Sequence, residues 1–425
     1  MPWRKPVPEM SDIKVGVLGI GSMGRHHVRN VRETPGLELV AVADPAGDKF
    51  GVAGELEVLP DVDALIAAGV EAAVVAVPTG YHHGVGLRLA EAGIHTLIEK
   101  PLASTVTQGQ EMVRAFHQAQ VVGATGYVER CNPALLELKR RIDAGQLGEI
   151  FQITTRRQGP FPVRIADVGV VKDLATHDVD LTAWLAASRH AAIAARTARK
   201  SGREHEDLVL ATGVLENGVL VNHVVNWFSP FKERVTTVTG EYGAFVADTM
   251  NSTLTFFESG TKAIEWNQIA AVRGDLEGHS TKYALDQREP LRVEHENFRD
   301  AIRAHRAALD PATTATAFDP ATTATALDPA THTPGIVTLD DALATLAPML
   351  SAADGLVRWE DPALTIDRRI RGVCPAPGAH TTYLGARFRL GPVTPVPEVT
   401  DLLPGQLRAT KHEVLVGTGG CAVRL

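Results

Sequence analysis

Residues 13–24 read IKVGVLGIGSMG, and residues 39–44 read LVAVAD. The first segment is an apolar strand that runs into Gly19, Gly21 and Gly24, and the second is a strand that ends on Asp44. In a GxGxxG turn the first glycine permits a tight bend, the second lets backbone amides approach a pyrophosphate, and the third allows close helix–strand packing. The order of strand, glycine turn, helix, strand and acid therefore predicts a dinucleotide-binding βαβ unit.

Asp44 indicates which dinucleotide this unit binds. A carboxylate at the tip of the second strand accepts hydrogen bonds from the hydroxyls of the adenosine ribose, which favours NAD over NADP. No arginine follows at positions 45 or 46 to hold a 2′-phosphate. The predicted cofactor is NAD, with NADP less favoured, and the residues predicted to bind it here are Gly19, Ile20, Gly21, Ser22, Met23, Gly24 and Asp44.

Composition narrows the class of protein. The 425 residues, 44% of them hydrophobic, suffice for two domains with further segments. A formal net charge of −8 provides no overall field that attracts nucleic acid, so no nucleic-acid partner is expected. The three cysteines, Cys131, Cys374 and Cys421, form no CxxC pair, which argues against a zinc knuckle or a disulfide framework and fits a reducing cytoplasm.

The chain shows no targeting or membrane signal. Residues 1–8 read MPWRKPVP and lack the apolar run of a secretory signal, so residues 1–12 are interpreted as a leader. No apolar stretch is long enough to span a bilayer. We expect a cytoplasmic protein without a membrane partner.

Strands alternate with helices up to about residue 127. This pattern predicts a parallel sheet with right-handed crossovers, that is, a doubly wound Rossmann domain over residues 13–127. Beyond the glycine turn and Asp44, the expected strands cover residues 70–78, 94–98 and 121–126, and the expected helices residues 84–92 and 108–118.

The pattern changes after residue 127. Consecutive β runs predict an α+β domain over residues 128–307 with a large, mainly antiparallel sheet. Asn132 as N-cap and Pro133 at the first helical position open its first helix. Helices are expected over residues 133–144, 174–184 and 294–307, and strands over residues 149–155, 208–215, 218–226, 234–239, 244–248 and 252–258.

Three near-copies of ALDPATTAT begin at residue 308. Nine residues rich in Ala, Thr and Pro cannot supply a packed face, so residues 308–334 are interpreted as a low-complexity surface loop. A C-terminal helix and strand are expected over residues 335–366. Residues 367–425 are rich in Gly, Pro and Arg with little periodicity, which favours a loosely ordered tail of unreadable role over a third domain.

Glu99-Lys100-Pro101 lies where the strand 94–98 ends. Ligands of open α/β sheets bind at this carboxyl edge, where the ammonium of Lys100 can donate to a substrate hydroxyl. The alternative is a solvated lysine at the end of a strand.

Asp173 and His177 are four residues apart on an expected helix. Removing a hydride from an alcohol requires a base for the hydroxyl proton, and an imidazole oriented by a carboxylate supplies one. The alternatives are a helix N-cap aspartate with a core histidine, or a metal site. Lys100 would repel a divalent cation, so no metal is expected.

Three cations could hold a substrate diphosphate, because guanidinium and ammonium groups bind phosphate oxygens. The alternative is solvated charge on an edge strand. The residues are Arg164, Lys232 and Arg234.

Together these motifs resemble the Gfo/Idh/MocA oxidoreductase family over residues 13–300 and 336–353. The resemblance rests on the glycine turn, on Pro78-Thr79-Gly80-Tyr81-His82, on Glu99-Lys100-Pro101 and on DLATHDVD at residues 173–180. It implies a Rossmann domain joined to an open-faced sheet domain, in which Lys100 positions the hydroxyl, His177 accepts its proton and Asp173 binds the sugar or assists His177. It also adds Pro78, Thr79, His82, Glu99 and Lys100 to the cofactor contacts.

Within the family, the chain is most similar to UDP-N-acetylglucosamine 3-dehydrogenase-like members through GYVERCNP at residues 126–133 and VVKDL at residues 170–174. Cys131 stands where phenylalanine is usual. The expected function is therefore NAD-dependent oxidation of a ring hydroxyl of a sugar, in particular a nucleotide sugar such as UDP-N-acetylglucosamine, by a homodimer or homotetramer. The alternatives are an inositol or free-sugar dehydrogenase, a glycosidase that retains NAD, and a non-catalytic NAD-binding protein.

Overall fold

The computed structural model describes most of the first 346 residues and part of the remainder. Two compact units divide the chain, one of residues 1–104 and 108–343 and the other of residues 105–107 and 344–425. The expected leader up to residue 10, the repeats from residue 310, Arg164 and Cys374 lie outside the described residues. The described residues are 11–162, 169–203, 205–259, 279–309, 336–346, 359, 363, 366, 370, 380–383, 386–391, 393–410 and 413–425.

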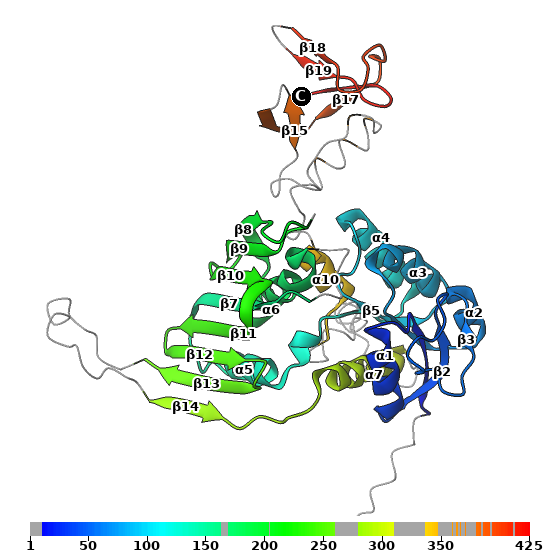
Figure 1. The fold of residues 1–425 in the computed structure, drawn as a ribbon, viewed down its shortest axis with the longest axis vertical. Coiled ribbons are helices and arrows are strands. Elements are labelled where there is room, and N and C mark those ends of the chain that lie inside the picture. Colours follow the sequence, from blue (N-terminus) through cyan, green and yellow to red (C-terminus); the bar gives the residue numbers. More distant parts are fainter. Residues whose placement is uncertain are drawn as a thin grey trace, which may run out of the picture. The chain divides into compact units, whose positions relative to one another are not determined.

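The N-terminal part of the first unit is a six-stranded parallel sheet of order β3-β2-β1-β4-β5-β6 (Figure 1). The strand order reverses between β1 and β4, the position at which doubly wound sheets bind ligands. Its strands are β1 Ile13–Leu18, β2 Leu37–Ala43, β3 Val58–Leu59, β4 Ala72–Val75, β5 His95–Glu99 and β6 Gly123–Gly126, and its helices are α1 Gly24–Glu33, α2 Val62–Ala67, α3 Thr79–Glu91 and α4 Val106–Ala119.

Apolar strands and two helices form the core of this part. Val15, Val17 and Val74 are fully or almost fully buried, as expected for parallel strands covered by helices. Phe298 and Ile302 belong to the same core, although they lie on α7 (Pro290–Leu309), far along the chain. Because α7 also packs against α1, it joins the two halves of the unit.

The second half contains an eight-stranded sheet of order β14-β13-β12-β11-β7-β10-β9-β8. All neighbouring pairs are antiparallel except β7 and β10, which are parallel. The predicted fold class, a Rossmann sheet with a large and mainly antiparallel second sheet, is confirmed. The strands are β7 Ile150–Pro160, β8 His190–Ala198, β9 Leu208–Leu215, β10 Leu220–Asn226, β11 Phe228–Gly240, β12 Gly243–Asp248, β13 Thr253–Glu258 and β14 Ser280–Tyr283.

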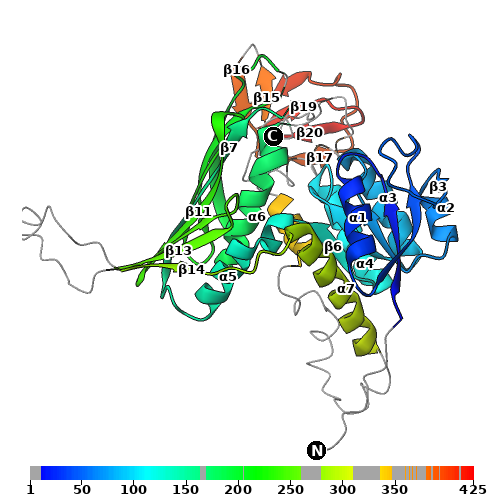
Figure 2. The same ribbon diagram turned by 60° about the horizontal axis from the view of Figure 1, so that its bottom comes forward.

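Two helices cover one face of this sheet, the face turned toward the Rossmann half (Figure 2). They are α5 (Pro133–Asp143) and α6 (Thr176–Leu185), whose apolar side chains share a core with alternate strand residues. Asn132 caps α5 as predicted, because its side chain accepts a hydrogen bond from the amide of Ala134. On the opposite face, Leu210 and Leu220 are exposed.

Some predicted boundaries were wrong. Helix α3 begins at Thr79 and not at residue 84, so His82 and His83 lie on a helix and not in a loop. Pro78 precedes the first helical residue, and its fixed φ suits a helix start. Sequence analysis did not identify β8, whose alanine-rich sequence shows little alternation between buried and exposed positions.

The second unit corrects the expectation of a loosely ordered tail. Its described residues include a four-stranded antiparallel sheet of order β17-β20-β19-β18 and a two-stranded sheet. Ile366, Ile370, Leu390, Val416 and Val423 pack together as a core. The strands are β15 His380–Tyr383, β16 Ala386–Arg389, β17 Thr394–Val396, β18 Leu407–Ala409, β19 Val414–Val416 and β20 Ala422–Arg424. Among the described residues of the whole chain, no helix is long and apolar enough to cross a membrane.

Candidate active site

The glycine turn after β1 has the geometry that a bound pyrophosphate needs. Gly19 has φ +82°, and a Cβ there would lie 2.8 Å from the backbone of Ala76. A Cβ on Gly24 would lie 1.8 Å from the carbonyl oxygen of Gly19, so this position must stay bare for α1 to begin against the strand. A Cβ on Gly21 would meet nothing within 4 Å, which leaves open space beside the turn where a phosphate fits.

Asp44 lies beside this turn at the end of β2. Its Oδ2 accepts a hydrogen bond from the amide of Ile20 at 3.0 Å, and its Oδ1 accepts one from the amide of Ala46 at 2.8 Å. These two bonds fix the carboxylate in the position where it could accept from ribose hydroxyls. The residues of this crevice therefore fit an adenine dinucleotide.

His82 joins two backbone segments at the same edge of the sheet. The ring is 1% exposed, with Nε2 2.9 Å from the carbonyl oxygen of Val77 and Nδ1 3.0 Å from that of Pro101. It thus links the segment after β4 to the turn that carries Lys100.

Lys100 follows β5 and reaches across to the second half of the unit. Its Nζ donates to the carbonyl oxygen of Asp173 at 2.8 Å and to the carboxylate Oδ1 of Asp173 at 3.1 Å. Both side chains are largely buried, at 19% and 14% exposure. The structure therefore brings together the two motifs that sequence analysis singled out, with Asp173 paired to Lys100.

Asp173 lies on one turn of π-helix, η2 (Val171–Ala175), which runs directly into α6. Turns of π-helix are rare in proteins, and those that occur are often found at functional sites. Glu206 anchors its start: its Oε1 accepts from the amide of Val171 at 3.2 Å, and its carbonyl oxygen accepts from the amide of Val170 at 2.9 Å.

His177 lies in the first turn of α6 and is 8% exposed. The ring of Tyr127 packs edge-on against His177, with centroids 5.9 Å apart, and Nδ1 of His177 is buried with no hydrogen-bond partner among the residues that the structure describes. Burial, reinforced by the positive charges of Lys100, Arg157 and Arg234, holds the pKa of His177 well below its usual value of 6.5. The imidazole is therefore neutral at neutral pH and can accept a proton.

Buried ion pairs hold the helix that carries His177. Arg157 on β7 donates from Nε to Asp178 at 3.0 Å and from Nη1 to Glu129 at 2.7 Å. Arg130 binds both carboxylate oxygens of Asp180 at 2.7 and 2.8 Å. Sequence analysis missed these groups, although charged residues in the otherwise apolar 174–185 segment were a signal that partners exist elsewhere in the fold.

Of the two predicted substrate cations that the structure describes, Arg234 is the one whose charge acts on His177. Its Nη1 donates to the carbonyl oxygens of Gln158 and Glu233 at 2.8 Å, and no carboxylate of the described residues lies within ion-pair distance of it. Lys232 is exposed on the same strand. The place of Arg164 is outside the described residues.

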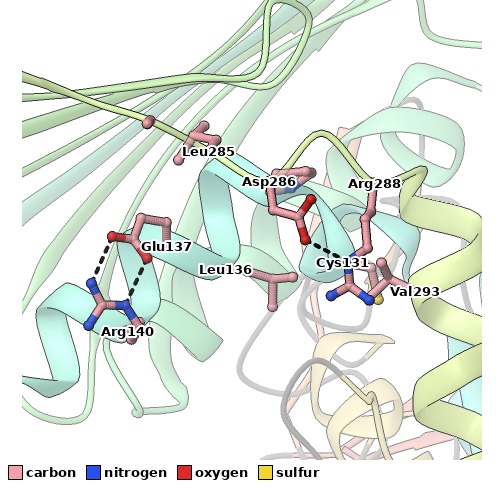
Figure 3. Close-up of a pocket in the computed structure, with 10 residues that line it drawn as sticks. Cys131, Leu136, Glu137, Arg140, Leu285, Asp286, Arg288 and Val293 are labelled. Atoms are coloured by element: carbon pink, nitrogen blue, oxygen red, sulfur yellow. Dashed lines mark hydrogen bonds and ion pairs between the residues drawn. The ribbon is translucent and has the colours of Figure 1, made fainter.

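A separate hollow of about 200 Å³ lies between α5 and the segment that leads into α7 (Figure 3). Cys131 faces this hollow together with Leu136. Its charged side chains pair with one another, Glu137 with Arg140 and Asp286 with Arg288. The hollow lacks Lys100 and His177 among its lining residues and is distinct from the site above.

Comparison with known proteins assigns both halves of the first unit. The family model described as "Oxidoreductase family, NAD-binding Rossmann fold" matches residues 13–127, and the "GFO/IDH/MocA C-terminal domain" matches residues 135–246. The chain belongs to the Gfo/Idh/MocA oxidoreductase family. Membership of this family makes it an oxidoreductase, and its named relatives are dehydrogenases that act on CH–OH groups, so the predicted family and enzyme class are confirmed.

Named relatives of this Gfo/Idh/MocA chain include two kinds of dehydrogenase. UDP-N-acetylglucosamine 3-dehydrogenase of Acidithiobacillus ferrooxidans is 29% identical over 305 residues, 70% of this chain and 91% of the relative. Its solved structure has a TM-score of 0.65 at 24% identity, covering 80% of this chain and 96% of that one, which shows the shared fold. The scyllo-inositol 2-dehydrogenase (NAD(+)) of Bacillus subtilis is 32% identical over 189 residues, 41% of this chain and 54% of the relative.

The second unit has different relatives. The family model "Formyl transferase, C-terminal domain" matches residues 349–425. Methionyl-tRNA formyltransferase of Streptomyces coelicolor is 52% identical over 81 residues, 19% of this chain and 26% of the relative. The chain thus spans about a quarter of this second relative, and sequence analysis missed the match.

Proposed function

We propose that this protein is an NAD-dependent dehydrogenase that oxidises a ring hydroxyl of a sugar, with nucleotide sugars such as UDP-N-acetylglucosamine as its substrate class. The observation that carries the proposal is the convergence of Lys100, Asp173 and His177 at the carboxyl edge of the Rossmann sheet. The preference for NAD over NADP rests on Asp44, whose negative charge would oppose a 2′-phosphate.

The chain's own groups would manage the hydroxyl proton. The nicotinamide of bound NAD supplies the hydride acceptor. Lys100 donates a hydrogen bond to the substrate oxygen and stabilises the negative charge that develops there. Neutral His177 accepts the hydroxyl proton, and Asp173 orients the ammonium of Lys100 so that it points into the site.

Arg234 supports the nucleotide-sugar class. It is a cation close to Asp173 and His177, and it has no carboxylate partner among the described residues. A guanidinium in this state can bind phosphate oxygens in bidentate fashion. Lys232, exposed on the same strand, would add a second cation for the diphosphate. The similarity to an inositol dehydrogenase makes inositols the competing substrate class.

The test replaces Lys100 and His177 by alanine and follows NADH formation with UDP-N-acetylglucosamine and with inositols. We expect kcat to fall at least about 100-fold in each variant, the usual contribution of a positioned acid or base, while NAD still binds. Lys139→Ala and His117→Ala are matched controls, because each residue pairs with a carboxylate outside the candidate site.

Each outcome separates the candidate functions. Unchanged turnover in Lys100→Ala and His177→Ala would contradict the assigned roles. Release of a sugar without net NADH would indicate a glycosidase that retains NAD. Tight NAD binding without turnover across the whole panel of polyols and nucleotide sugars would indicate a non-catalytic NAD-binding protein.

A further inference from the structure

A buried chain of hydrogen bonds runs behind Lys100, away from the substrate side. Glu99, the residue before Lys100, accepts from Nε2 of His27 at 2.8 Å through Oε1. Its Oε2 accepts from the amide of Lys100 at 3.1 Å. The Nδ1 of His27 lies 3.0 Å from Nε2 of His295. The four residues come from the end of β5, from α1 and from α7.

The two histidines are closed off from solvent, and Glu99 is largely buried at 13% exposure. His27 is 1% exposed and His295 is fully buried, and the two rings meet edge-to-face with centroids 5.2 Å apart. A charged carboxylate in such a place requires hydrogen-bond donors. Burial raises the pKa of Glu99, but the hydrogen bond from His27 and the positive charge of Lys100 outweigh burial and hold this pKa below its usual value, so Glu99 is ionised.

The ionised carboxylate sets the direction of its bond to His27. Because Glu99 only accepts, Nε2 of His27 carries the proton of that bond, and a further proton lies between Nδ1 of His27 and Nε2 of His295. His295 ends this series of bonds, and its Nδ1 is buried without a hydrogen-bond partner among the described residues. Glu294, another buried acid near Glu99, likewise has an oxygen with no partner in the part of the chain that the structure describes.

The position of His27 connects this series of hydrogen bonds to the helix that would hold the coenzyme. It lies on α1, three residues after Gly24, on the helix whose first turn faces the pyrophosphate site. Glu99 and the backbone of Lys100 are therefore tied directly to the helix that would hold the coenzyme. Hydride transfer depends on the relative placement of coenzyme and substrate, and an error of about 1 Å can cost about 100-fold in rate.

We propose that His27 and His295 are positioning residues, which hold Glu99 and through it fix the backbone of Lys100 in register with the coenzyme-binding helix α1. The proposal rests on the proposed function, in which Lys100 contacts the substrate hydroxyl. His27 and His295 themselves contact neither substrate nor coenzyme in this scheme.

Two substitutions at His27 separate positioning from simple packing. The amide nitrogen of glutamine can take the place of Nε2, so His27→Gln keeps the donor to Glu99. The shorter asparagine reaches only the place of Nδ1, so His27→Asn keeps the contact to His295 and loses the donor to Glu99. His83→Asn is the matched control, because it removes a histidine–carboxylate bond of 2.7 Å, that between His83 and Glu111 on α3 and α4.

We expect His27→Asn to lower kcat about 10- to 100-fold, with the KM for the sugar and the dissociation constant of NAD within about threefold of the wild type. His27→Gln restores kcat to within about threefold, and His83→Asn leaves it unchanged. Because His27 acts through Glu99, Glu99→Gln combined with His27→Asn loses no more than the larger single effect.

Three results would overturn the proposal. The first is a wild-type kcat per NAD-binding site in His27→Asn, with only stability reduced. The second is an equal loss of kcat in His27→Gln and His27→Asn, and the third is multiplicative losses in the double variant. Lys100→Ala distinguishes failure of the positioning role from failure of the proposed function. If Lys100→Ala also keeps wild-type turnover, the proposed function itself has failed. If Lys100→Ala is inactive while His27→Asn is fully active, only the positioning role has failed.

Discussion

The ammonium of Lys100 donates to both the backbone carbonyl and the carboxylate of Asp173, 73 residues further along the chain. Lys100 belongs to the Rossmann half and Asp173 to the sheet half of the first unit, so this pair joins the two halves at the candidate active site. Because the carbonyl bond does not depend on the side chain, Asp173 contributes both charge and backbone geometry.

The first prediction concerns this pair. Asp173→Asn keeps an oxygen that can accept from Lys100 but removes the charge, whereas Asp173→Ala removes both. We expect kcat/KM to fall about 10-fold in Asp173→Asn and about 100-fold or more in Asp173→Ala, since hydrogen bonds to charged groups contribute about 1.5–3 kcal/mol. Steady-state kinetics of both variants test this, and equal activity of the two would contradict it.

The second prediction concerns pH. The positive charge of Arg234 lowers the pKa of His177, so its removal must raise that pKa. In the wild type, kcat/KM should fall on the acid side only below pH 6.5. In Arg234→Gln this acid limb should move to higher pH. Rate profiles from pH 5 to 9 measure the shift, with Lys139→Gln as control, and a shift toward lower pH would refute the assignment of the limb to His177.

Local patterns were sufficient to predict the first half of the unit. The structure of segment 13–44 is determined by local features, because its apolar strand residues, its three glycines and its terminal acid each influence only residues nearby in the sequence. The same holds for the capping of α5 by Asn132. Lys100, Asp173 and His177 were found by motif, and the meeting of Lys100 and Asp173 across the fold followed from the family resemblance.

Contacts between distant residues could not be predicted in this way. His27 and His295 are 268 positions apart, and the partner of Arg157 in α6 depends on how β7 packs. The π-turn at Asp173 depends on the anchoring by Glu206, which comes from another loop. The strands of the second unit are three or four residues long, too short to show alternation, which explains why that core escaped prediction.

The third prediction concerns the choice of coenzyme. Asp44→Ser removes the carboxylate that would accept hydrogen bonds from the ribose hydroxyls and would repel a 2′-phosphate. We expect the ratio of kcat/KM for NAD to that for NADP to fall at least about 10-fold, because each lost charged hydrogen bond is worth about a factor of ten or more. Asp48→Ser is the control, since Asp48 caps its own loop through the amides of Phe50 and Ala53. An unchanged ratio in Asp44→Ser would remove the basis for the NAD preference.

The fourth prediction concerns stability in acid. Burial lowers the pKa of His95 from 6.5 to about 4, so the unfolded chain binds a proton at this residue between those values while the folded chain does not. Folding stability is therefore lost as pH falls below 6.5, and from pH 7.5 to 5.5 His95 alone should cost about 1 kcal/mol. His95→Asn keeps an acceptor for the amide of Val122 but does not titrate. Denaturation at both pH values should show a smaller pH dependence in His95→Asn, and an identical dependence would contradict the assignment.

The fifth prediction separates coenzyme binding from folding within the glycine turn. A methyl group on Gly21 meets nothing within 4 Å in the protein, so Gly21→Ala should melt at the wild-type temperature. It would occupy the space that a pyrophosphate must enter, and we expect NAD to bind at least about 10-fold more weakly. A methyl group on Gly24 would overlap the carbonyl of Gly19, at 1.8 Å, so Gly24→Ala should lose about 2 kcal/mol or more of stability. Thermal melts with and without NAD distinguish the two effects. Wild-type NAD affinity in Gly21→Ala would show that the coenzyme does not lie over this turn, and a large loss of stability in it would contradict the open space beside Gly21.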